Sequence, residues 1–267
     1  MPIHYDKQGH IVTITIDRYE RRNAFDVEHS VQMIDAWERF NDDPDAWVAI
    51  VTGVKDAFCA GGDLHTMSQI AKERIENDGL SPTLDLITRN GTRYFTLKGF
   101  EIYKPIIAAV NGQCWAGGME MLGGTDIRIA SRDAVFNVSE PKRGLFAGGG
   151  TTARLPRQLA WPAAMEMLLV ARPTSAERAL QLGLINEVCE REELMDVAMS
   201  WAEEICKNAP LSVQATKKSA LRSIAVATLE EAYAIEDALS NEVFQTEDAK
   251  EGPRAFFEKR DPVWQGR

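Results

Sequence analysis

The sequence predicts an α/β protein, because short apolar strands alternate with helices along the first half of the chain. Residues 47–53 and 105–112 form almost wholly apolar runs that end at glycine, as is typical of strands buried on both faces. Residues 27–41 carry apolar side chains at helical spacing before the first run. A sheet covered by helices on both faces is therefore the expected architecture.

The other strands of the first half are shorter or more polar. Residues 10–17 are rich in β-branched side chains that alternate with period two, which predicts a strand. Residues 127–130 and 134–136 are shorter strand candidates after the second apolar run. Between the two apolar runs lies the polar segment 64–99, which we expect to be a mobile helical stretch with a loop.

From about residue 160 the pattern becomes helical, and Pro173, Gly183 and Pro210 interrupt it. The expected helical segments are 163–171, 175–183, 192–208 and 211–249, with one further short strand at 185–189. No Gly/Ser/Pro-rich linker divides the chain. We therefore expect one α/β core to about residue 200 and a helical C-terminal section packed on it.

The charge of the chain limits its partners. Its 30 Lys and Arg against 40 Asp and Glu give a net charge of −10, which argues against a nucleic acid or an anionic membrane surface as partner. An anionic small ligand stays open, held by a few local Arg or Lys and by backbone N–H groups. No apolar run approaches the ~20 residues of a membrane span, and the polar start predicts no secretory signal.

The cysteines and histidines argue against metal and redox sites. The 4 cysteines lie far apart without a CxxC pair, so we expect buried reduced thiols in a cytoplasmic protein. The 4 histidines all lie within the first 65 residues and form no HExxH motif, which argues against a zinc site and against a Ser/His/Asp triad. Residues 148–153 resemble a dinucleotide fingerprint, but residues 141–144 before them do not form a strand. We expect no nicotinamide cofactor and no metal.

Three glycine-rich spots are candidates for chemistry: residues 58–64, 116–120 and 148–152. A junction from strand through glycine to helix leaves backbone N–H groups free, and these favour a developing anion. Two such junctions that converge on one carbonyl oxygen would form an oxyanion hole. The alternative for each is a tight turn without a chemical role.

Two glutamates stand near these glycines. Glu120 follows Gly117 by three residues, so a helix that begins at Gly117 carries both on one face, and the apolar neighbours of Glu120 favour a raised pKa. The alternative is an ion pair with Arg128 or Arg132. Glu140 follows a strand candidate, and the alternative there is a solvent-facing loop carboxylate. Two carboxyl groups around one carbonyl site suit acid/base chemistry.

Together these segments resemble the crotonase (enoyl-CoA hydratase/isomerase) superfamily over nearly the whole chain. The matching motifs, in family order, are 21–25 (RRNAF), 57–64 (AFCAGGDL), 105–112 leading into 116–120 (AGGME), 126–130, 136–155 and 255–262 (AFFEKRDP). The resemblance implies a spiral of ββα units over residues 1–200, which hold the CoA and acyl sites. It also implies a helical trimerisation region over residues 201–267 and a homotrimer or a dimer of trimers.

The resemblance also implies roles for single residues. Ala60 and Gly117 match the two N–H donors of the oxyanion hole, and Glu120 and Glu140 match the two acidic residues of the hydratases. The positions that match the substrate and coenzyme A contacts are Arg22, Ala24, Ala60, Gly61, Gly62, Asp63, Leu64, Phe256 and Lys259. In some family members the last two positions reach coenzyme A from a neighbouring subunit.

The implied function is that of an enoyl-CoA hydratase, a lyase that adds water in syn fashion to a 2-enoyl-CoA or removes it. Coenzyme A is part of the substrate, and no separate cofactor is required. The alternatives are a Δ3-Δ2 enoyl-CoA isomerase, which usually keeps only the acid that matches Glu140, a thioester hydrolase or dehalogenase, and a catalytically silent or RNA-binding member. Ser139, Ala147 and residues 141–143 (PKR), which are bulkier and more basic than usual, depart from the family pattern, and the long segment 64–99 leaves the acyl group open.

Overall fold

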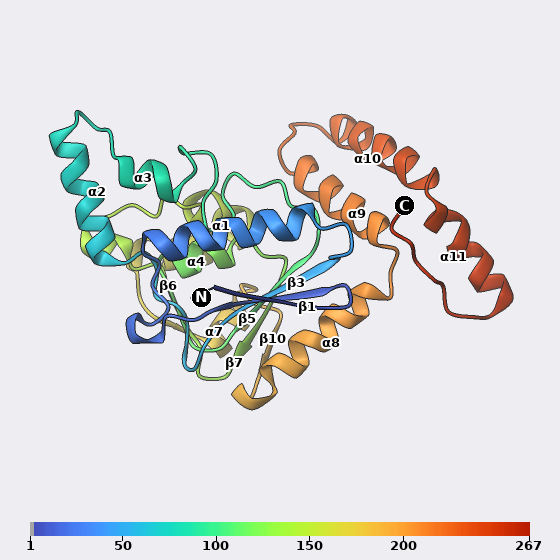
Figure 1. Ribbon diagram of the computed structural model, residues 1–267, viewed down its shortest axis with the longest axis horizontal. Coiled ribbons are helices and arrows are strands. Elements are labelled where there is room, and N and C mark those ends of the chain that lie inside the picture. Colours follow the sequence, from blue (N-terminus) through green and yellow to red (C-terminus); the bar gives the residue numbers. More distant parts are fainter. Residues whose placement is uncertain (1–2) are drawn as a thin grey trace.

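The computed structural model describes residues 3–267 and contains two β-sheets, with helices packed around them (Figure 1). The larger sheet has 6 strands in the order β1-β2-β3-β5-β7-β10. Its strands are β1 (Ile3–Gln8), β2 (Ile11–Ile16), β3 (Val48–Gly53), β5 (Ile106–Val110), β7 (Ile127–Ser131) and β10 (Glu187–Cys189). β1 pairs antiparallel with β2, and all other pairs in this sheet are parallel. The predicted α/β class is confirmed.

The smaller sheet carries the strands that lead into the candidate site. Its 4 strands are β4 (Ala57–Cys59), β6 (Gln113–Trp115), β8 (Val135–Asn137) and β9 (Thr174–Ser175), in the order β4-β6-β8-β9. Each parallel strand follows a strand of the larger sheet and precedes a helical turn or helix, so the chain repeats a ββα unit. Because both sheets advance in the same chain order, the units form the spiral that the family resemblance implied.

The two faces of the larger sheet divide the core, as alternating side chains on strands require. On one face, α1 (Val27–Asp42) buries Met33, Trp37 and Phe40 against residues such as Ile14 and Val51. On the other face, α8 (Leu194–Cys206) packs on β3, β5 and β7. The sheet is thus covered on both faces, which explains why its central strands are almost wholly apolar.

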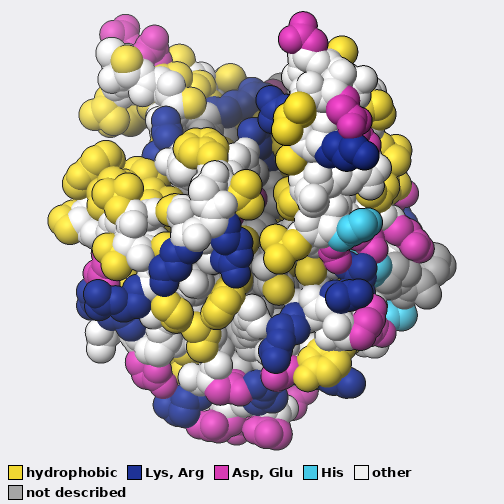
Figure 2. All heavy atoms as spheres, turned by 90° about the vertical axis from the view of Figure 1, so that its left-hand side faces the viewer, with side chains coloured by type: hydrophobic (Ala, Val, Ile, Leu, Met, Phe, Trp, Pro, Cys, Tyr) yellow, Lys and Arg dark blue, Asp and Glu magenta, His cyan; other side chains and the backbone are white. Residues whose placement is uncertain are grey.

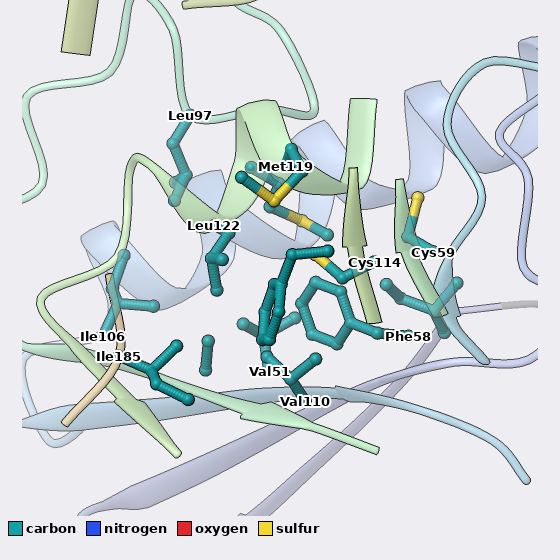
Figure 3. Packing of buried hydrophobic residues seen from close by; sticks show 14 of the residues in the cluster. Val51, Phe58, Cys59, Leu97, Ile106, Val110, Cys114, Met119, Leu122 and Ile185 are labelled. Atoms are coloured by element: carbon teal, nitrogen blue, oxygen red, sulfur yellow. The ribbon is translucent and has the colours of Figure 1, made fainter. Parts of the chain in front are cut away.

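Helix α4 (Gly117–Leu122) packs against β4 and β6 of the smaller sheet and is buried within the protein. Its Met119 and Leu122 point into the core, where Phe58 and Cys114 of the smaller sheet meet Val51 and its neighbours of the larger one (Figure 3). All six residues of α4 are buried. A helix held this firmly fixes the direction of any polar side chain that it carries.

The C-terminal helices are present but divided. The predicted helical stretch 211–249 consists of α9 (Pro210–Ser223), α10 (Leu229–Phe244) and the start of α11 (Glu247–Glu258). Thr228 begins α10 with a capping box, and Thr246 caps α11. Each hydroxyl thus starts a new helix at a point where the spacing of apolar residues alone predicts one continuous helix. In Figure 1 these three helices project from the side of the molecule opposite α2.

The remaining elements were predicted in part, since helices were expected within 64–99 and from about residue 160 but not at residues 19–21, 140–143 or 151–158. They are η1 (Tyr19–Arg21), α2 (Leu64–Glu76), α3 (Pro82–Ile87), η2 (Glu140–Arg143), α5 (Thr151–Gln158), α6 (Trp161–Met165), the π-helical turn η3 (Glu166–Val170), α7 (Ala176–Gln181) and η4 (Arg191–Glu193). Strands β1, β4, β6 and β9 were not predicted, because the first is polar and the other three span only 2 or 3 residues each. No helix within residues 3–267 is long and apolar enough to cross a membrane.

Candidate active site

The candidate site begins where two parallel strands of the smaller sheet end side by side. β4 and β6 place Cys59 opposite Cys114, and each strand leads into a glycine-containing junction that starts a helix. A Cβ atom on Gly61 would lie 2.7 Å from the Cβ of Ala116 and 3.0 Å from the backbone N of Gly117. The two junctions are therefore in contact, and the contact requires glycine at residue 61, where φ is +103°.

The backbone between β6 and α4 is strained. Ala116 has φ 48° and ψ −118°, a conformation that costs a residue with a side chain about 1–3 kcal/mol. This turn sets Gly117 as the first residue of α4, with its N–H outside the helical hydrogen bonds. Phe95 closes over the junction, because a Cβ on Gly117 would lie 2.9 Å from the ring of Phe95, which stacks on Phe25 at 4.1 Å. Phe95 was not predicted, since nothing local in the segment 64–99 marks it.

The backbone hydrogen bonds argue for a different residue as one of the two predicted oxyanion-hole donors. The N–H of Ala60 donates to the carbonyl of Arg22 at 3.1 Å, and the N–H of Gly61 donates to the Cys59 sulfur at 3.3 Å. The N–H groups of Gly62 and Gly117 donate to no protein acceptor within residues 3–267. The assignment of Ala60 as an oxyanion donor therefore does not fit this structure, because a partner from the loop before α1 already occupies its N–H.

That loop, residues 18–25, is bound tightly to the first glycine junction. Buried Asn23 donates to the carbonyl of Ala57 at 2.6 Å, and the N–H of Phe25 donates to the carbonyl of Gly61 at 2.8 Å. Arg18 forms ion pairs with Asp26 and Asp63 at 3.0 and 2.9 Å. The structure thus brings the predicted positions Arg22 and Ala24 next to residues 60–64.

Phe256 and Lys259 are not brought to this site within one chain. Both lie at the end of α11, which Figure 1 places at the opposite end of the molecule from α2. The side chain of Phe256 is exposed. The face near α2 is hollowed between two projecting parts, and Lys, Arg and hydrophobic side chains border the hollow (Figure 2).

Glu120 lies on α4, three residues after Gly117, and is 8% exposed. Its Oε1 accepts the N–H of Gly149 at 2.5 Å, and a Cβ on Gly149 would lie 2.3 Å from Oε2. Burial first, and then the charge of Glu140, raise the pKa of Glu120 to about 7, although the Gly149 N–H, Arg154 and Lys98 oppose the shift.

Glu140 begins the short helical turn η2, which two residues separate from the end of β8, and is also 8% exposed, so the solvent-facing alternative is excluded. Burial raises the pKa of Glu140, while the nearby charge of Arg143 opposes the rise. Its Oε2 has no hydrogen-bond partner within the described chain. An unpaired buried carboxyl oxygen is costly, and such groups concentrate at functional sites.

The alternative that Glu120 forms an ion pair with Arg128 or Arg132 is also excluded. Arg128 donates to Thr125, Leu184 and Gln158. Arg132 forms ion pairs with Glu177 and Glu190 on the surface. The site therefore holds two buried carboxyl groups and two backbone N–H groups that lack an acceptor within the described part of the chain.

The family model for enoyl-CoA hydratase/isomerase matches residues 6–267. The chain belongs to the enoyl-CoA hydratase/isomerase family. It is 39% identical over 264 residues to an enoyl-CoA hydratase of Mycobacterium tuberculosis, a match that covers 98% of this chain and 96% of that protein. It is 37% identical to the (E)-benzylidenesuccinyl-CoA hydratase of Thauera aromatica over 100% of both chains. A carnitinyl-CoA dehydratase of Salmonella enteritidis is also 37% identical, over 99% of this chain and 98% of that one.

Solved structures of this family superpose on the whole chain. A Bacillus anthracis enoyl-CoA hydratase has a TM-score of 0.90 at 29% identity and full coverage of both chains. An enoyl-CoA hydratase structure from Mycobacterium tuberculosis has a TM-score of 0.87 at 36% identity, covering 100% of this chain and 99% of that one. The protein is thus an enzyme of the crotonase family, and the family resemblance seen in the sequence is confirmed.

Proposed function

We propose that this family member is an enoyl-CoA hydratase, which adds water in syn fashion across the C2–C3 double bond of a 2-enoyl-CoA thioester. The observation that carries the proposal is the burial of both Glu120 and Glu140 at a site where the N–H groups of Gly62 and Gly117 have no acceptor among the residues that the structure describes. Hydration moves protons at two neighbouring carbons and places negative charge on the thioester oxygen, so it uses both features.

In this proposal the thioester oxygen lies between the N–H groups of Gly62 and Gly117. Both groups lack a protein acceptor within residues 3–267, and the Gly61–Gly117 contact keeps the two junctions together. The backbone is fixed before substrate arrives, so little reorganisation is needed when charge develops on the oxygen. One donor of this kind contributes about 2.7–4 kcal/mol to the lowering of the barrier.

The two carboxyl groups divide the proton transfers. Ionised Glu120 takes a proton from the water whose oxygen bonds to C3, and the π electrons of the double bond move toward the thioester oxygen. Protonated Glu140 gives its proton to C2 as the electrons return from the thioester oxygen. The proton that Glu120 took from water then passes to Glu140, directly or through solvent, so that both carboxyls regain their starting states and the elements of one water are added in total. Burial raises the pKa of both carboxyl groups, which brings their proton exchange closer to neutral pH, and the two titrate as a pair, so this division of roles is a proposal about the reaction and not about the resting enzyme. The same steps in reverse give dehydration.

Coenzyme A binding and assembly belong to the same proposal. Arg22, Ala24 and residues 60–64 line the nucleotide and pantetheine path, and Phe256 and Lys259 reach coenzyme A from a neighbouring subunit of a homotrimer or dimer of trimers. Exposed apolar side chains on the C-terminal helices support a subunit contact there; they include Leu221, Ile224, Leu229, Phe244, Phe256 and Phe257. The unpaired cysteines Cys59, Cys114, Cys189 and Cys206 support a cytoplasmic enzyme.

The decisive experiment follows the ultraviolet absorbance of the conjugated thioester in crotonyl-CoA. We expect the absorbance to fall with the wild-type protein, and to fall at least about 10²-fold more slowly with either Glu120→Gln or Glu140→Gln. Undiminished turnover in Glu140→Gln would contradict the assignment of the C2 proton. A 3-enoyl-CoA that isomerises equally well in the wild type and in Glu120→Gln would favour the isomerase alternative.

The acyl group is then surveyed with a short panel of thioesters. The relatives named above are a benzylidenesuccinyl-CoA hydratase and a carnitinyl-CoA dehydratase, so aromatic, carboxylated and cationic acyl chains belong in that panel. Absence of hydration with every 2-enoyl-CoA in the panel, at any pH between 6 and 9, would contradict the proposed function.

A further inference from the structure

The end of the segment 64–99 touches the surroundings of Glu120 through a closed set of hydrogen bonds. The Thr96 hydroxyl donates to the carbonyl of Gly149 at 2.7 Å, and the N–H of Gly149 donates to the Glu120 carboxylate at 2.5 Å. Arg154 closes the ring, because its Nη1 donates to the carbonyls of both Thr96 and Glu120, at 2.8 and 3.0 Å. We call Thr96, Gly149, Arg154 and Glu120 the Thr96–Arg154 ring.

We propose that Thr96 and Arg154 are positioning residues, which hold the Gly149 peptide against the Glu120 carboxylate and so tie the segment 64–99 to the base. This inference rests on the proposed role of Glu120, but it goes beyond that role. The ring joins three parts of the chain that no covalent geometry keeps together: the end of the segment 64–99, helix α4, and the loop before α5. The ring engages both the N–H and the C=O of Gly149, which belong to two successive peptide groups, and the carbonyl of Gly148 accepts a hydrogen bond from Lys98 at 2.7 Å.

The packing around the ring leaves its members little freedom. Thr96 is 1% exposed. A Cβ on Gly150 would lie 2.8 Å from Nη1 of Arg154, and one on Gly124 would lie 3.1 Å from the same atom. The guanidinium therefore lies against glycine backbones while its Nη1 donates to two carbonyls. A side chain of this kind fixes geometry at the carboxylate without touching a substrate.

The direction of the expected effect follows from the charge on Glu120. The Gly149 N–H favours the ionised carboxylate, so a loosened Gly149 peptide moves the titration of Glu120 to higher pH. The other groups that face Glu120 are Glu140, Lys98 and Arg154, and Glu120 also acts on the buried Cys59 thiol. Removing the Thr96 hydroxyl leaves all of these charges unchanged, so that the shift reports the hydrogen bond alone.

The test is an infrared pH titration of the protonated carboxyl band, assigned to Glu120 by its loss in Glu120→Gln. Thr96→Val keeps the shape of the side chain and removes the hydroxyl, whereas Thr96→Ser keeps the hydroxyl. We expect the Glu120 midpoint to rise by about half a pH unit or more in Thr96→Val and to stay within about 0.2 in Thr96→Ser. The same midpoint in all three proteins would overturn the proposal.

Two further readouts keep the test decisive. Arg154→Lys retains the charge but not the planar guanidinium whose Nη1 donates to two carbonyls, so the Glu120 midpoint is expected to rise there as well, even if Thr96→Val does not fold. With an active substrate, the acidic limb of kcat/KM moves in the same direction, and kcat falls more than KM rises. Because the infrared titration needs no substrate, its result is independent of whether the protein hydrates an enoyl-CoA.

Discussion

The Glu120 carboxylate leaves no room for even one methyl group at residue 149. In Gly149→Ala the new Cβ would lie 2.3 Å from Oε2 of Glu120, about 1.1 Å short of the 3.4 Å at which ordinary contact begins. Because Glu120 lies on a fully buried helix, the carboxylate must move by a distance of that order. A misplacement of about 1 Å costs roughly 10²-fold in rate, or about 2.7 kcal/mol of barrier.

We therefore expect Gly149→Ala to lower kcat for 2-enoyl-CoA hydration about 10²-fold, with a smaller change in KM. The matched control is Gly148→Ala, since a Cβ on Gly148 would meet nothing closer than 3.7 Å, and this variant is expected to keep wild-type turnover. Circular dichroism establishes that both variants are folded. Wild-type kcat in Gly149→Ala, or an equal loss in both variants, would refute the placement of Glu120 at the reacting atoms.

Three further predictions concern stability. The pKa of Glu120 is raised from 4.5 to about 7, so the wild type loses stability as pH rises between these values. The free energy of unfolding of Glu120→Gln should therefore exceed that of the wild type by on the order of 1–3 kcal/mol at pH 8 and equal it at pH 4, which thermal unfolding at the two pH values measures. Ala116→Gly relieves the strained backbone and should raise Tm by about 2–4 °C, a result that a lower Tm would contradict. Glu251 accepts hydrogen bonds from Arg260 and from the Val263 N–H, so Glu251→Gln should speed hydrogen exchange in residues 261–267 while exchange in the sheets stays unchanged.

The fold was predictable where each element carries its own signal. The strands at 48–53 and 106–110 are continuous apolar runs, and α1 has an apolar stripe, so local pattern sufficed. Strand β1 was not predicted, because its sequence is polar and mostly exposed and the strand is defined by its pairing with β2. The spiral arrangement followed from the family resemblance alone, since periodicity does not say in which sheet a strand lies.

The candidate site was predictable for its carboxyl groups and less so for its donors. Glu120 stood out because a charged residue between apolar neighbours is costly, and its burial agrees with that reasoning. The choice of Ala60 failed because its N–H is occupied by the carbonyl of Arg22, a contact made across 38 residues of chain. Phe95 and Thr96 lie in a segment of irregular structure, where no period marks the side chains that face inward.

The two cations nearest to Glu120, Arg154 and Lys98, bind backbone carbonyls and not the carboxylate. Arg154 and Lys98 lie close enough to oppose the raised pKa of Glu120, yet both donate to backbone carbonyls and neither pairs with the carboxylate. A carboxyl group buried for stability would be expected to have such a cation as its direct partner. Here Glu120 accepts one backbone N–H, and Oε2 of Glu140 accepts no hydrogen bond within residues 3–267. The cations therefore moderate the cost of burial while leaving oxygen lone pairs free to exchange protons with a substrate.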